Sequence, residues 1–452
     1  MKKVISLFLV LAMLCACVGA FAEAGDGYPE KVEGIDFGGA TVYVYDYWSS
    51  TPSDEYADDL TDEQAAQKAY REWIDTTYNV HVVQVAKGDW STCAEEMINF
   101  CSAPDGSLCM FIIEPGKVGS LMANGLCASW TNDLVDLTDS KWNSADSELM
   151  TKQGEVYGVY AGNTEPRQCL YFNKRVLEEA GIEWETIYDM QADGTWTWEA
   201  FEDMLKQIQK DTDNDGVIDI YGMTGSCDDL CLISVFSNGG SFFDFDENGD
   251  LSITAGSDNT LEGLTFAQNI WLNYAYQCPE GGSWDYYKDA WKQGFCGFYM
   301  YQCYGGFNDN SEMADMADEW GCVAFPVGPN GTTYTTIGSD NMTLIPSIYD
   351  AETTAKLAFI YDLWTNPTPG YDDEDSWIGN KYNYTDDRAV DETYAMLRES
   401  EHVSTNKTSL LGTNNDILGS SVLWSITSAT PAELIEAATP AWQALCDTFN
   451  GK

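Results

Sequence analysis

ATVYVYDY at residues 40–47 and VHVVQV at 80–85 are two short runs rich in β-branched and aromatic residues. Such runs are typical of buried strands. Between them, Thr61 and Gln64 have the spacing of a capping box, and apolar side chains from Ala66 to Ile74 repeat at helical spacing. A strand, a helix and a second strand in this order predict a unit of a parallel α/β sheet.

The same alternation of helix and strand signals continues along the chain. A helix around 94–100 is expected before an apolar strand at 108–113, and Thr197 is placed to cap a helix with an apolar face. Helices are also predicted over 351–364 and 431–449. Further strands are predicted at 154–160, 170–174, 294–301, 321–326 and 342–346. The sequence therefore predicts an α/β protein, and it shows no internal repeat.

The composition is that of an acidic globular protein. Its 452 residues include 22 Lys and Arg against 73 Asp and Glu, which gives a formal charge of -51. A charge of this size often signals disorder, but 16 Trp, 26 Tyr and 18 Phe can form a large hydrophobic core. Nucleic acids and anionic membrane surfaces are excluded as partners, because both are bound by clustered basic residues.

The N-terminus predicts export. Two lysines precede the apolar run 4–14, which is shorter than the ~20 residues of a membrane span and has the form of a secretory signal. Ala20-Phe21-Ala22 is an A-x-A cleavage site that would remove residues 1–22. Alternatively, Leu14-Cys15-Ala16-Cys17 resembles a lipobox, in which Cys17 would carry a lipid anchor. Processing at either site would place the mature chain outside the cytoplasm, either secreted or at the cell envelope.

Of 14 cysteines, two lie in the signal segment and twelve remain, many of them inside apolar runs. A disulfide scaffold is typical of short secreted chains with small cores, so buried free thiols are expected here. Cys227 and Cys231 are close enough in sequence to pair or to bind a metal. A zinc site is not expected, because the chain has two histidines and no second cysteine pair with this spacing.

Six motifs follow one another along the chain: GEVYGVY (154–160), LYFNKRVLEEAGI (170–182), WTWEAFEDM (196–204), DTDNDGVIDIYG (211–222), WKQGFCGFYM (291–300) and WGCVAFPVGP (320–329). In this order they resemble the family 1 extracellular solute-binding proteins, a family that includes maltose-binding protein. Its members are the capture subunits of carbohydrate importers driven by ATP-binding cassettes. The resemblance implies a type II periplasmic-binding fold, in which crossing hinge strands join two α/β lobes and the ligand binds between them.

The resemblance also implies where the lobes meet. The first crossover would span residues 158–172 and the second 323–340. Lobe one would comprise residues 23–160 plus 325–366, and lobe two residues 161–324 plus 367–452. Ligand sites in α/β proteins lie at the carboxyl ends of parallel strands and at domain interfaces, which agrees with a site between the lobes.

The function implied by the resemblance is capture of a carbohydrate and its delivery to the permease subunits of an ABC importer. The acidic charge disfavours anionic solutes, so a neutral oligosaccharide is the expected ligand. The chain is expected to be a monomer, without enzymatic activity and without a required cofactor. Because fold does not fix the ligand, a binding protein for peptides or another small solute is the alternative, and a secreted carbohydrate-active enzyme is a less favoured one.

Sugar sites combine aromatic faces, which stack on pyranose rings, with carboxylates and amides that bond hydroxyl groups. The predicted ligand contacts are Asp46, Tyr47, Trp48, Glu114, Tyr160, Asn163, Arg167, Tyr301, Tyr304 and Trp424. The first four lie at or directly after the ends of predicted strands, and the next three lie at the implied first crossover. By resemblance, Tyr304 stands where maltose-binding protein has a stacking tryptophan. The structural alternatives are that Trp48 packs under a loop, Arg167 pairs with an acid and Trp424 belongs to the core.

The run DTDNDGVID at 211–219 places oxygen ligands at positions 1, 3, 5 and 9 of a loop, with glycine at position 6, as in an EF-hand. Gly222 stands at position 12, so the bidentate glutamate is missing. Two interpretations stay open: a structural calcium ion, or a well-made turn. The calcium ligands would be Asp211, Asp213, Asp215, the Val217 carbonyl and Asp219. Asn248-Gly249, between two strand-like segments, predicts a hairpin turn.

Overall fold

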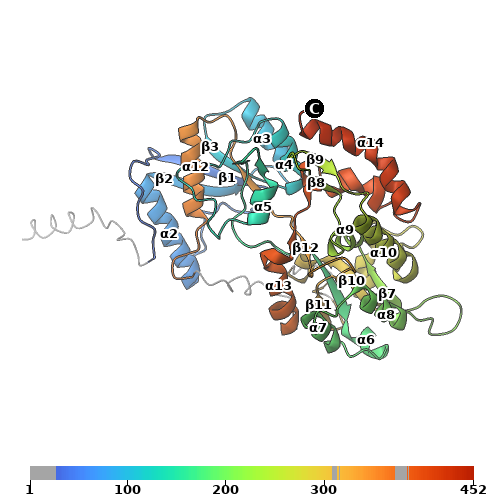
Figure 1. The fold of residues 1–452 in the computed structure, drawn as a ribbon. Coiled ribbons are helices and arrows are strands. Elements are labelled where there is room, and N and C mark those ends of the chain that lie inside the picture. Colours follow the sequence, from blue (N-terminus) through green and yellow to red (C-terminus); the bar gives the residue numbers. More distant parts are fainter. Residues whose placement is uncertain (1–26, 308–312, 315, 372–383, 385) are drawn as a thin grey trace, which may run out of the picture.

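The computed structural model describes residues 27–452, except 308–312, 315, 372–383 and 385. The predicted signal segment, with both cleavage sites and Cys17, lies outside the described residues. Figure 1 shows two α/β lobes, each built around its own sheet and covered by helices. Across the described ranges, no helix is long and apolar enough to cross a membrane.

The first sheet contains the strand–helix–strand unit predicted from the sequence. Its strands, in spatial order, are β13 (Met342–Leu344), β3 (Leu108–Ile113), β1 (Ala40–Asp46) and β2 (Val80–Ala86). β1 pairs in parallel with β2 and β3, whereas β13 runs antiparallel to β3 at the edge. Parallel neighbours need a crossover connection, and α2 (Asp62–Tyr78), which begins at the predicted Thr61–Gln64 capping box, supplies it.

Helices cover both faces of the first sheet. Met110 packs with α2 and α12 (Ala351–Trp364), while the next residue, Phe111, packs on the opposite face with α3 (Cys93–Ser102) and α4 (Pro115–Ala123). Successive side chains of a strand point to opposite faces, so β3 contributes to two separate layers. Burial on both sides explains why these strands read as continuous apolar runs in the sequence.

The second sheet is mixed. Its spatial order is β11 (Trp320–Val323), β6 (Gln168–Asn173), β10 (Cys296–Gln302) and β7 (Tyr221–Gly225). β6 runs antiparallel to β10 and β11, and β10 runs parallel to β7. Its helices are α6 (Lys174–Glu179), α7 (Glu185–Ala192), α8 (Trp198–Ile208), α9 (Cys227–Ser237), α10 (Asp258–Tyr274) and α11 (Tyr286–Lys292). As predicted, the Thr197 side chain caps α8 by accepting from Ala200 N.

Two crossing segments connect the sheets. Residues 157–167 lead from the first sheet to β6, and residues 324–341 lead back from β11 to β13. The segments are joined where the backbone nitrogens of Arg167 and Gln168 donate to Thr336 Oγ1, at 2.8 and 3.3 Å. The short elements near the first crossing are α5 (Ser144–Leu149), β4 (Thr151–Lys152) and β5 (Glu155–Val156). The exact lobe boundaries, 23–160 plus 325–366 and 161–324 plus 367–452, remain a prediction.

The C-terminal part of the chain folds back over both lobes (Figure 1). Its elements are the π-helix η3 (Ala389–Tyr394), α13 (Ala395–Arg398), the 3₁₀ turn η4 (Ser400–His402), β14 (Val403–Ser404), the 3₁₀ turn η5 (Lys407–Leu410), the π-helix η6 (Asn415–Leu423) and α14 (Pro431–Phe449). β14 pairs in parallel with β12 (Thr336–Ile337) of the second crossing segment. A Cβ on Gly119 of α4 would lie 1.9 Å from the carbonyl oxygen of Leu410, so η5 packs directly against lobe one.

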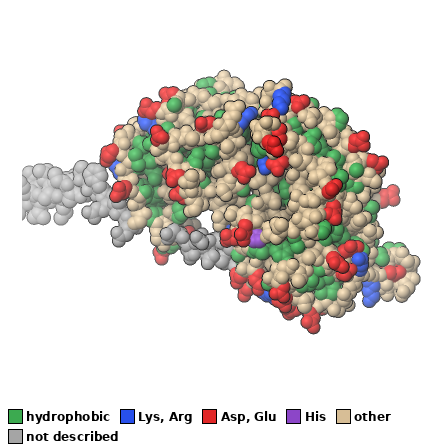
Figure 2. Space-filling view, viewed as in Figure 1, with side chains coloured by type: hydrophobic (Ala, Val, Ile, Leu, Met, Phe, Trp, Pro, Cys, Tyr) green, Lys and Arg blue, Asp and Glu red, His purple; other side chains and the backbone are tan. Residues whose placement is uncertain are grey.

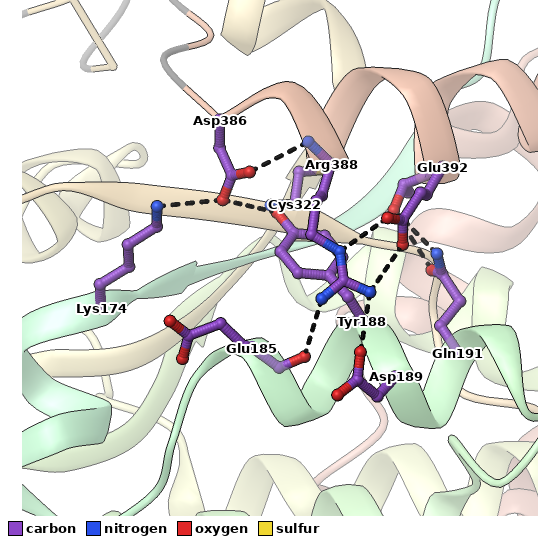
Figure 3. Close-up of polar contacts among 10 residues, drawn as sticks. Lys174, Glu185, Tyr188, Asp189, Gln191, Cys322, Asp386, Arg388 and Glu392 are labelled. Carbon is purple, nitrogen blue, oxygen red and sulfur yellow. Dashed lines mark hydrogen bonds and ion pairs between the residues drawn. The ribbon is translucent and has the colours of Figure 1, made fainter.

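A polar network attaches the segment before η3 to lobe two (Figure 3). Asp386, which is buried, accepts a hydrogen bond from the Tyr188 hydroxyl at 3.1 Å and forms an ion pair with Lys174 Nζ at 3.0 Å. Arg388 pairs with Asp189 of α7 at 2.9 Å and with Glu392 of its own helix at 2.6 Å. Removing one partner of a buried ion pair leaves the other charge uncompensated. Loss of either Lys174 or Asp386 should therefore destabilise the packing of this segment against lobe two.

Two surface features agree with the sequence. Figure 2 shows carboxylates spread over the visible face of the protein among few basic side chains.

The predicted Asn248-Gly249 turn joins β8 (Phe243–Phe245) to β9 (Leu251–Ile253), with Gly249 at φ +79°. A positive φ is accessible to glycine because it has no Cβ, which explains why glycine occupies this position of the turn.

Candidate ligand-binding site

A cavity of about 680 Å³ lies between the two lobes. Lobe one, lobe two, the second crossing segment and the C-terminal segment 406–416 all contribute to its wall. Its volume is within the usual range for small-molecule sites, which is roughly 300–1,000 Å³. The predicted contacts Tyr47, Glu114 and Arg167 line this interlobe cavity.

The lobe-one wall contributes two aromatic rings. Tyr47 follows β1, and its hydroxyl donates a hydrogen bond to Asn341 Oδ1 at 2.8 Å. Trp90 follows β2 and is 53% exposed. Lys117 Nζ lies 4.4 Å from the centroid of the Trp90 ring and also donates to the Trp90 carbonyl oxygen. This cation–π contact orients an otherwise exposed ring at the cavity wall.

Two polar groups in the wall lack partners. Glu114 precedes α4, and its Oε2 is buried without a hydrogen-bond partner among the described residues. Burial raises the pKa of Glu114. Arg167 Nη2 donates to the Ser339 carbonyl oxygen at 2.9 Å, but Arg167 Nε is buried and has no acceptor in the described part of the chain. The wall therefore offers one unsatisfied acceptor and one unsatisfied donor.

The lobe-two wall is acidic. Asp228 and Asp229 lie in the first turn of α9, directly after β7. Asp229 is 7% exposed, and its Oδ1 accepts from Gln168 Nε2 at 3.1 Å, while Gln168 Oε1 accepts from Ile337 N at 3.2 Å. Burial, with the charge of Asp228 as a second cause, raises the pKa of Asp229 to about 6. Gln168 thus holds this carboxylate in place and ties it to the second crossing segment.

Two of the residues predicted after β1 do not line the cavity. The Asp46 carboxylate is buried and accepts from the backbone nitrogens of Trp48 and Ser49, at 3.2 and 3.0 Å, and from Gln84 Nε2 at 2.6 Å. Its oxygens are therefore used in forming the turn. Trp48 is 52% exposed and lies edge-on to Tyr47, with ring centroids 4.9 Å apart, outside the cavity wall.

Apart from Arg167, the contacts predicted at the first crossover and around the end of β10 are also placed elsewhere. Asn163 lines a separate polar pocket of about 350 Å³, together with Arg398. Tyr160 lies within the first crossing segment but does not line the cavity, and burial raises the pKa of its hydroxyl. The Tyr301 ring is buried in lobe two, and its hydroxyl bonds to that of Tyr304, which is 43% exposed, at 2.9 Å.

Trp424 belongs to a second, apolar pocket of about 280 Å³, called here the aromatic pocket. Its ring lies edge-on to that of Trp284, with centroids 5.9 Å apart, and both rings are exposed, at 45% and 67%. Trp271, Tyr286 and Tyr287 also line this pocket. Asp228 lines both the aromatic pocket and the interlobe cavity, so the two adjoin.

Several cavity residues were missed by the sequence analysis. They are Trp90, Gln168, Asp228, Asp229, Gln302, Asn341, Asn406 and Asp416. Trp90 follows the predicted strand 80–85, so the rule that selected Tyr47 and Glu114 would have found it. Asp228 and Asp229 follow β7, a strand that was not predicted. Segment 406–416 does not follow a predicted strand, so the sequence did not indicate that its residues line the cavity.

The aspartate loop is a well-formed turn on lobe two. Asp211 accepts from the backbone nitrogens of Asn214 and Gly216, at 2.7 and 2.9 Å, and Asp219 accepts from Thr212 N at 2.7 Å. Hydrogen bonds from Thr212 lower the pKa of Asp219. Asp211, Asp213 and Asp215 each place one carboxylate oxygen within 4.8 Å of the others, a spacing that fits a cation. The calcium ligand set stays a prediction.

All twelve described cysteines are free, and most are buried. Burial raises the pKa of Cys109 and Cys127 to about 12, which keeps both as thiols. They therefore pack as small apolar side chains, as expected from the sequence.

Comparisons with known proteins place the chain among binding proteins. The sequence profile of the family described as bacterial extracellular solute-binding protein matches residues 42–361. An arabinooligosaccharide-binding protein of Halalkalibacterium halodurans is 28% identical over 151 residues, which are 33% of this chain and 29% of that relative. The chain thus spans under a third of that relative's length.

Two solved structures have the same fold. A cyclic alpha-maltosyl-1,6-maltose binding protein from Arthrobacter globiformis superposes with a TM-score of 0.62 at 14% identity, covering 90% of this chain and 99% of the other. UgpB from Mycobacterium tuberculosis, in complex with glycerophosphocholine, superposes with a TM-score of 0.59 at 16% identity, covering 89% and 98%. These likenesses confirm the predicted two-lobe fold, and the different ligands show that the fold alone does not select one.

Proposed function

The chain belongs to the bacterial extracellular solute-binding protein family, and we propose that it captures a neutral oligosaccharide in the interlobe cavity. The observation that carries this proposal is that aromatic rings and unsatisfied polar groups line the same cavity. Tyr47 and Trp90 offer faces for the C–H surface of a sugar ring. Glu114 and Arg167 line the same cavity, and opening of the lobes would let their unsatisfied Oε2 and Nε atoms bond its hydroxyl groups.

The charges in the cavity support a neutral ligand. Glu114, Asp228, Asp229 and Asp416 line it, whereas the basic side chains among its described lining residues are Lys117 and Arg167. Both basic groups already donate to backbone carbonyl oxygens. An anionic solute would approach against the long-range field of a chain with a formal charge of -51 and would meet carboxylates in the cavity.

The aromatic pocket supports an oligosaccharide rather than a single sugar. Because it adjoins the interlobe cavity at Asp228, a chain bound in the cavity can extend over the exposed rings of Trp284 and Trp424. The similarity to an arabinooligosaccharide-binding protein is consistent with a carbohydrate, although it covers one third of the chain.

The mechanism we propose is reversible capture without chemical change. The ligand binds between open lobes, the lobes close by bending at the crossing segments, and the closed form is presented to the permease of an ABC importer. The exported chain acts as a monomer, secreted or anchored through Cys17. Any calcium ion on the Asp211–Asp219 loop is structural and takes no part in capture.

A thermal-shift panel tests the proposal. Neutral oligosaccharides of arabinose and glucose, a uronate oligosaccharide and a set of peptides are each added to the mature protein, and reducing ends are assayed in parallel. We expect stabilisation by a neutral oligosaccharide, through linkage, and no release of reducing ends. Stabilisation by peptides alone would favour the other binding class. A uronate that binds more tightly than its neutral counterpart would refute the charge argument.

A further inference from the structure

Gln168 joins three parts of the molecule that meet at the interlobe cavity. It is the first residue of β6, it lines the cavity, and it is 5% exposed. Its Nε2 donates to Asp229 Oδ1 at 3.1 Å, and its Oε1 accepts from Ile337 N at 3.2 Å. Its backbone nitrogen donates to Thr336 Oγ1 at 3.3 Å. One residue therefore connects a carboxylate of α9 with the second crossing segment, at the point where the first crossing segment ends.

The orientation of the Gln168 amide is determined by its two partners. A backbone N–H can only donate, so the amide oxygen must face Ile337. The amide nitrogen then faces Asp229, whose carboxylate accepts when it is ionised. Rotating the amide by half a turn would place donor against donor and acceptor against acceptor. The two partners therefore hold the amide between them, and loss of one partner weakens its bond to the other.

Ile337 lies where the second crossing segment reaches the cavity. It belongs to β12, which pairs in parallel with β14, and the next residue, Gly338, donates through its backbone nitrogen to the Ser404 carbonyl oxygen at 3.0 Å. The cavity is lined by Ile337 and by the two residues that follow it. In the proposed mechanism the lobes close by bending at the crossing segments, so Gln168 is bonded to a part of the chain that takes part in closure.

We propose that Gln168 is a positioning residue that holds Asp229 as an acceptor at the cavity wall and couples this carboxylate to Ile337 in the second crossing segment. A ligand hydroxyl that donates to Asp229 then acts, through a single amide, on the segment that bends as the lobes close. The role in ligand capture rests on the proposed function, whereas the link between Asp229 and Ile337 is present without a ligand.

The charge of Asp229 gives this role a measurable signature. The hydrogen bond from Gln168 opposes the rise that burial and Asp228 cause in the pKa of Asp229, so losing this bond should raise that pKa further. The charged and titratable groups around Asp229 are Asp228 on its own helix, Tyr304 and, among the residues that line the cavity with it, Glu114, Lys117, Arg167 and Asp416. A Gln168→Met variant keeps all of them.

The first test looks for the link in the ligand-free mature protein. Amide hydrogen exchange of short peptides that contain Ile337 is measured for the native protein, Asp229→Asn and Asp229→Ala. The asparagine keeps an oxygen that accepts from Gln168, whereas the alanine removes it. We expect Asp229→Ala to speed exchange at Ile337 about fivefold and Asp229→Asn to leave it near the native rate. Equal rates in all three proteins would overturn the proposal.

A double variant tests whether the effect passes through Gln168. In Gln168→Met the Ile337 N–H has already lost its acceptor, so adding Asp229→Ala should cause no further change in exchange. A further increase of about fivefold in the double variant would show that Asp229 acts on Ile337 by another route, and it would refute the role of Gln168.

The second test measures affinity for the neutral oligosaccharide as a function of pH. We expect the pH at which affinity declines to be about 0.5–1 unit higher in Gln168→Met than in the native protein, because the ionised form of Asp229 has lost a donor. A uniform loss of affinity, with the midpoint of the decline unchanged, would show that Gln168 has only a structural role.

Gln191→Met is the matched control. Gln191 is also 5% exposed, and its Oε1 accepts from Ala324 N of the second crossing segment at 2.8 Å. Its Nε2, however, donates to Thr393, outside the cavity wall. The control should keep the native midpoint even where it lowers stability. Failure of every oligosaccharide to bind would refute the proposed function and leave the exchange results standing, because these are obtained without a sugar.

Discussion

The two walls of the interlobe cavity differ in kind. Lobe one presents aromatic faces, with Trp90 53% exposed and oriented by Lys117. Lobe two presents carboxylates, with Asp229 7% exposed and fixed by Gln168. An aromatic face can contact a sugar ring while the lobes are apart, but a buried carboxylate can be reached only along the cavity. The difference suggests that lobe one makes the first contact and that lobe two completes the site on closure.

Replacing the lobe-one ring should have the largest effect. We expect Trp90→Ala to weaken binding of the neutral oligosaccharide about 10- to 100-fold, because burying an aromatic or large aliphatic side chain contributes about 1.5–3 kcal/mol. Titration calorimetry measures the affinity. Trp48→Ala is the matched control, since Trp48 is equally exposed on the same lobe but lies outside the cavity wall. An equal loss of oligosaccharide affinity in the two variants would refute the inference that Trp90 makes the first contact with the sugar.

Changing the lobe-two carboxylate should have a smaller effect that depends on pH. Hydrogen bonds to a charged acceptor are stronger by about 1 kcal/mol than those to a neutral one, so Asp229→Asn should weaken binding about fivefold to tenfold. The raised pKa of about 6 means that native affinity is highest above this pH and declines as pH falls through it. The variant should lose that dependence. Exposed Asp193, changed to Asn, serves as the control.

The aromatic pocket adjoins the interlobe cavity at Asp228 and offers further aromatic contacts to a long ligand. We expect Trp424→Ala to weaken binding of long oligosaccharides about twofold to tenfold, because one aromatic contact adds about 0.5–1.5 kcal/mol. Disaccharide binding should not change, since a short ligand does not reach past Asp228. Affinities measured over a series of chain lengths test this. A similar loss at every length would place Trp424 within the main site instead.

The aspartate loop should have the smallest effect and none on affinity. If it holds calcium, a chelator should lower the melting temperature by about 1–2 °C, as expected for a weak site on a large chain. Asp213→Asn should abolish this change, whereas Asp246→Asn, in the β8–β9 turn, should not. Oligosaccharide affinity should be the same with and without the ion. A melting temperature that chelator leaves unaltered would favour the well-made turn.

Much of the secondary structure could be predicted from the sequence, because its signals are local. β3, α12 and α14 begin and end at the predicted residues, and α14 has a capping box at Thr430 and Glu433. The strand predicted over 154–160 is shorter, since β5 ends at Val156. A Cβ on Gly158 would come within 2.7 Å of Leu344 and Met150, so the chain passes close to these side chains at a position where only glycine fits.

The candidate site was predictable only where it follows the ends of strands. Tyr47 and Glu114 are such residues, and Trp90, which follows the predicted strand 80–85, could have been found in the same way, whereas the strand before Asp229 was not predicted. Asp46 was chosen by the same rule, but its carboxylate accepts from the backbone of Trp48 and Ser49 in its own turn and from the side chain of Gln84, which is distant in sequence.

The sequence alone was enough for the family, the α/β class and the order of the elements, because caps, periodicity and motifs act over short stretches of chain. The meeting of Asn341, Asn406 and Asp416 with Tyr47 depends on how the crossing segments pack between the lobes. Packing over such distances in sequence is set by the whole core. No local pattern encodes this packing, and the cavity between the lobes results from it.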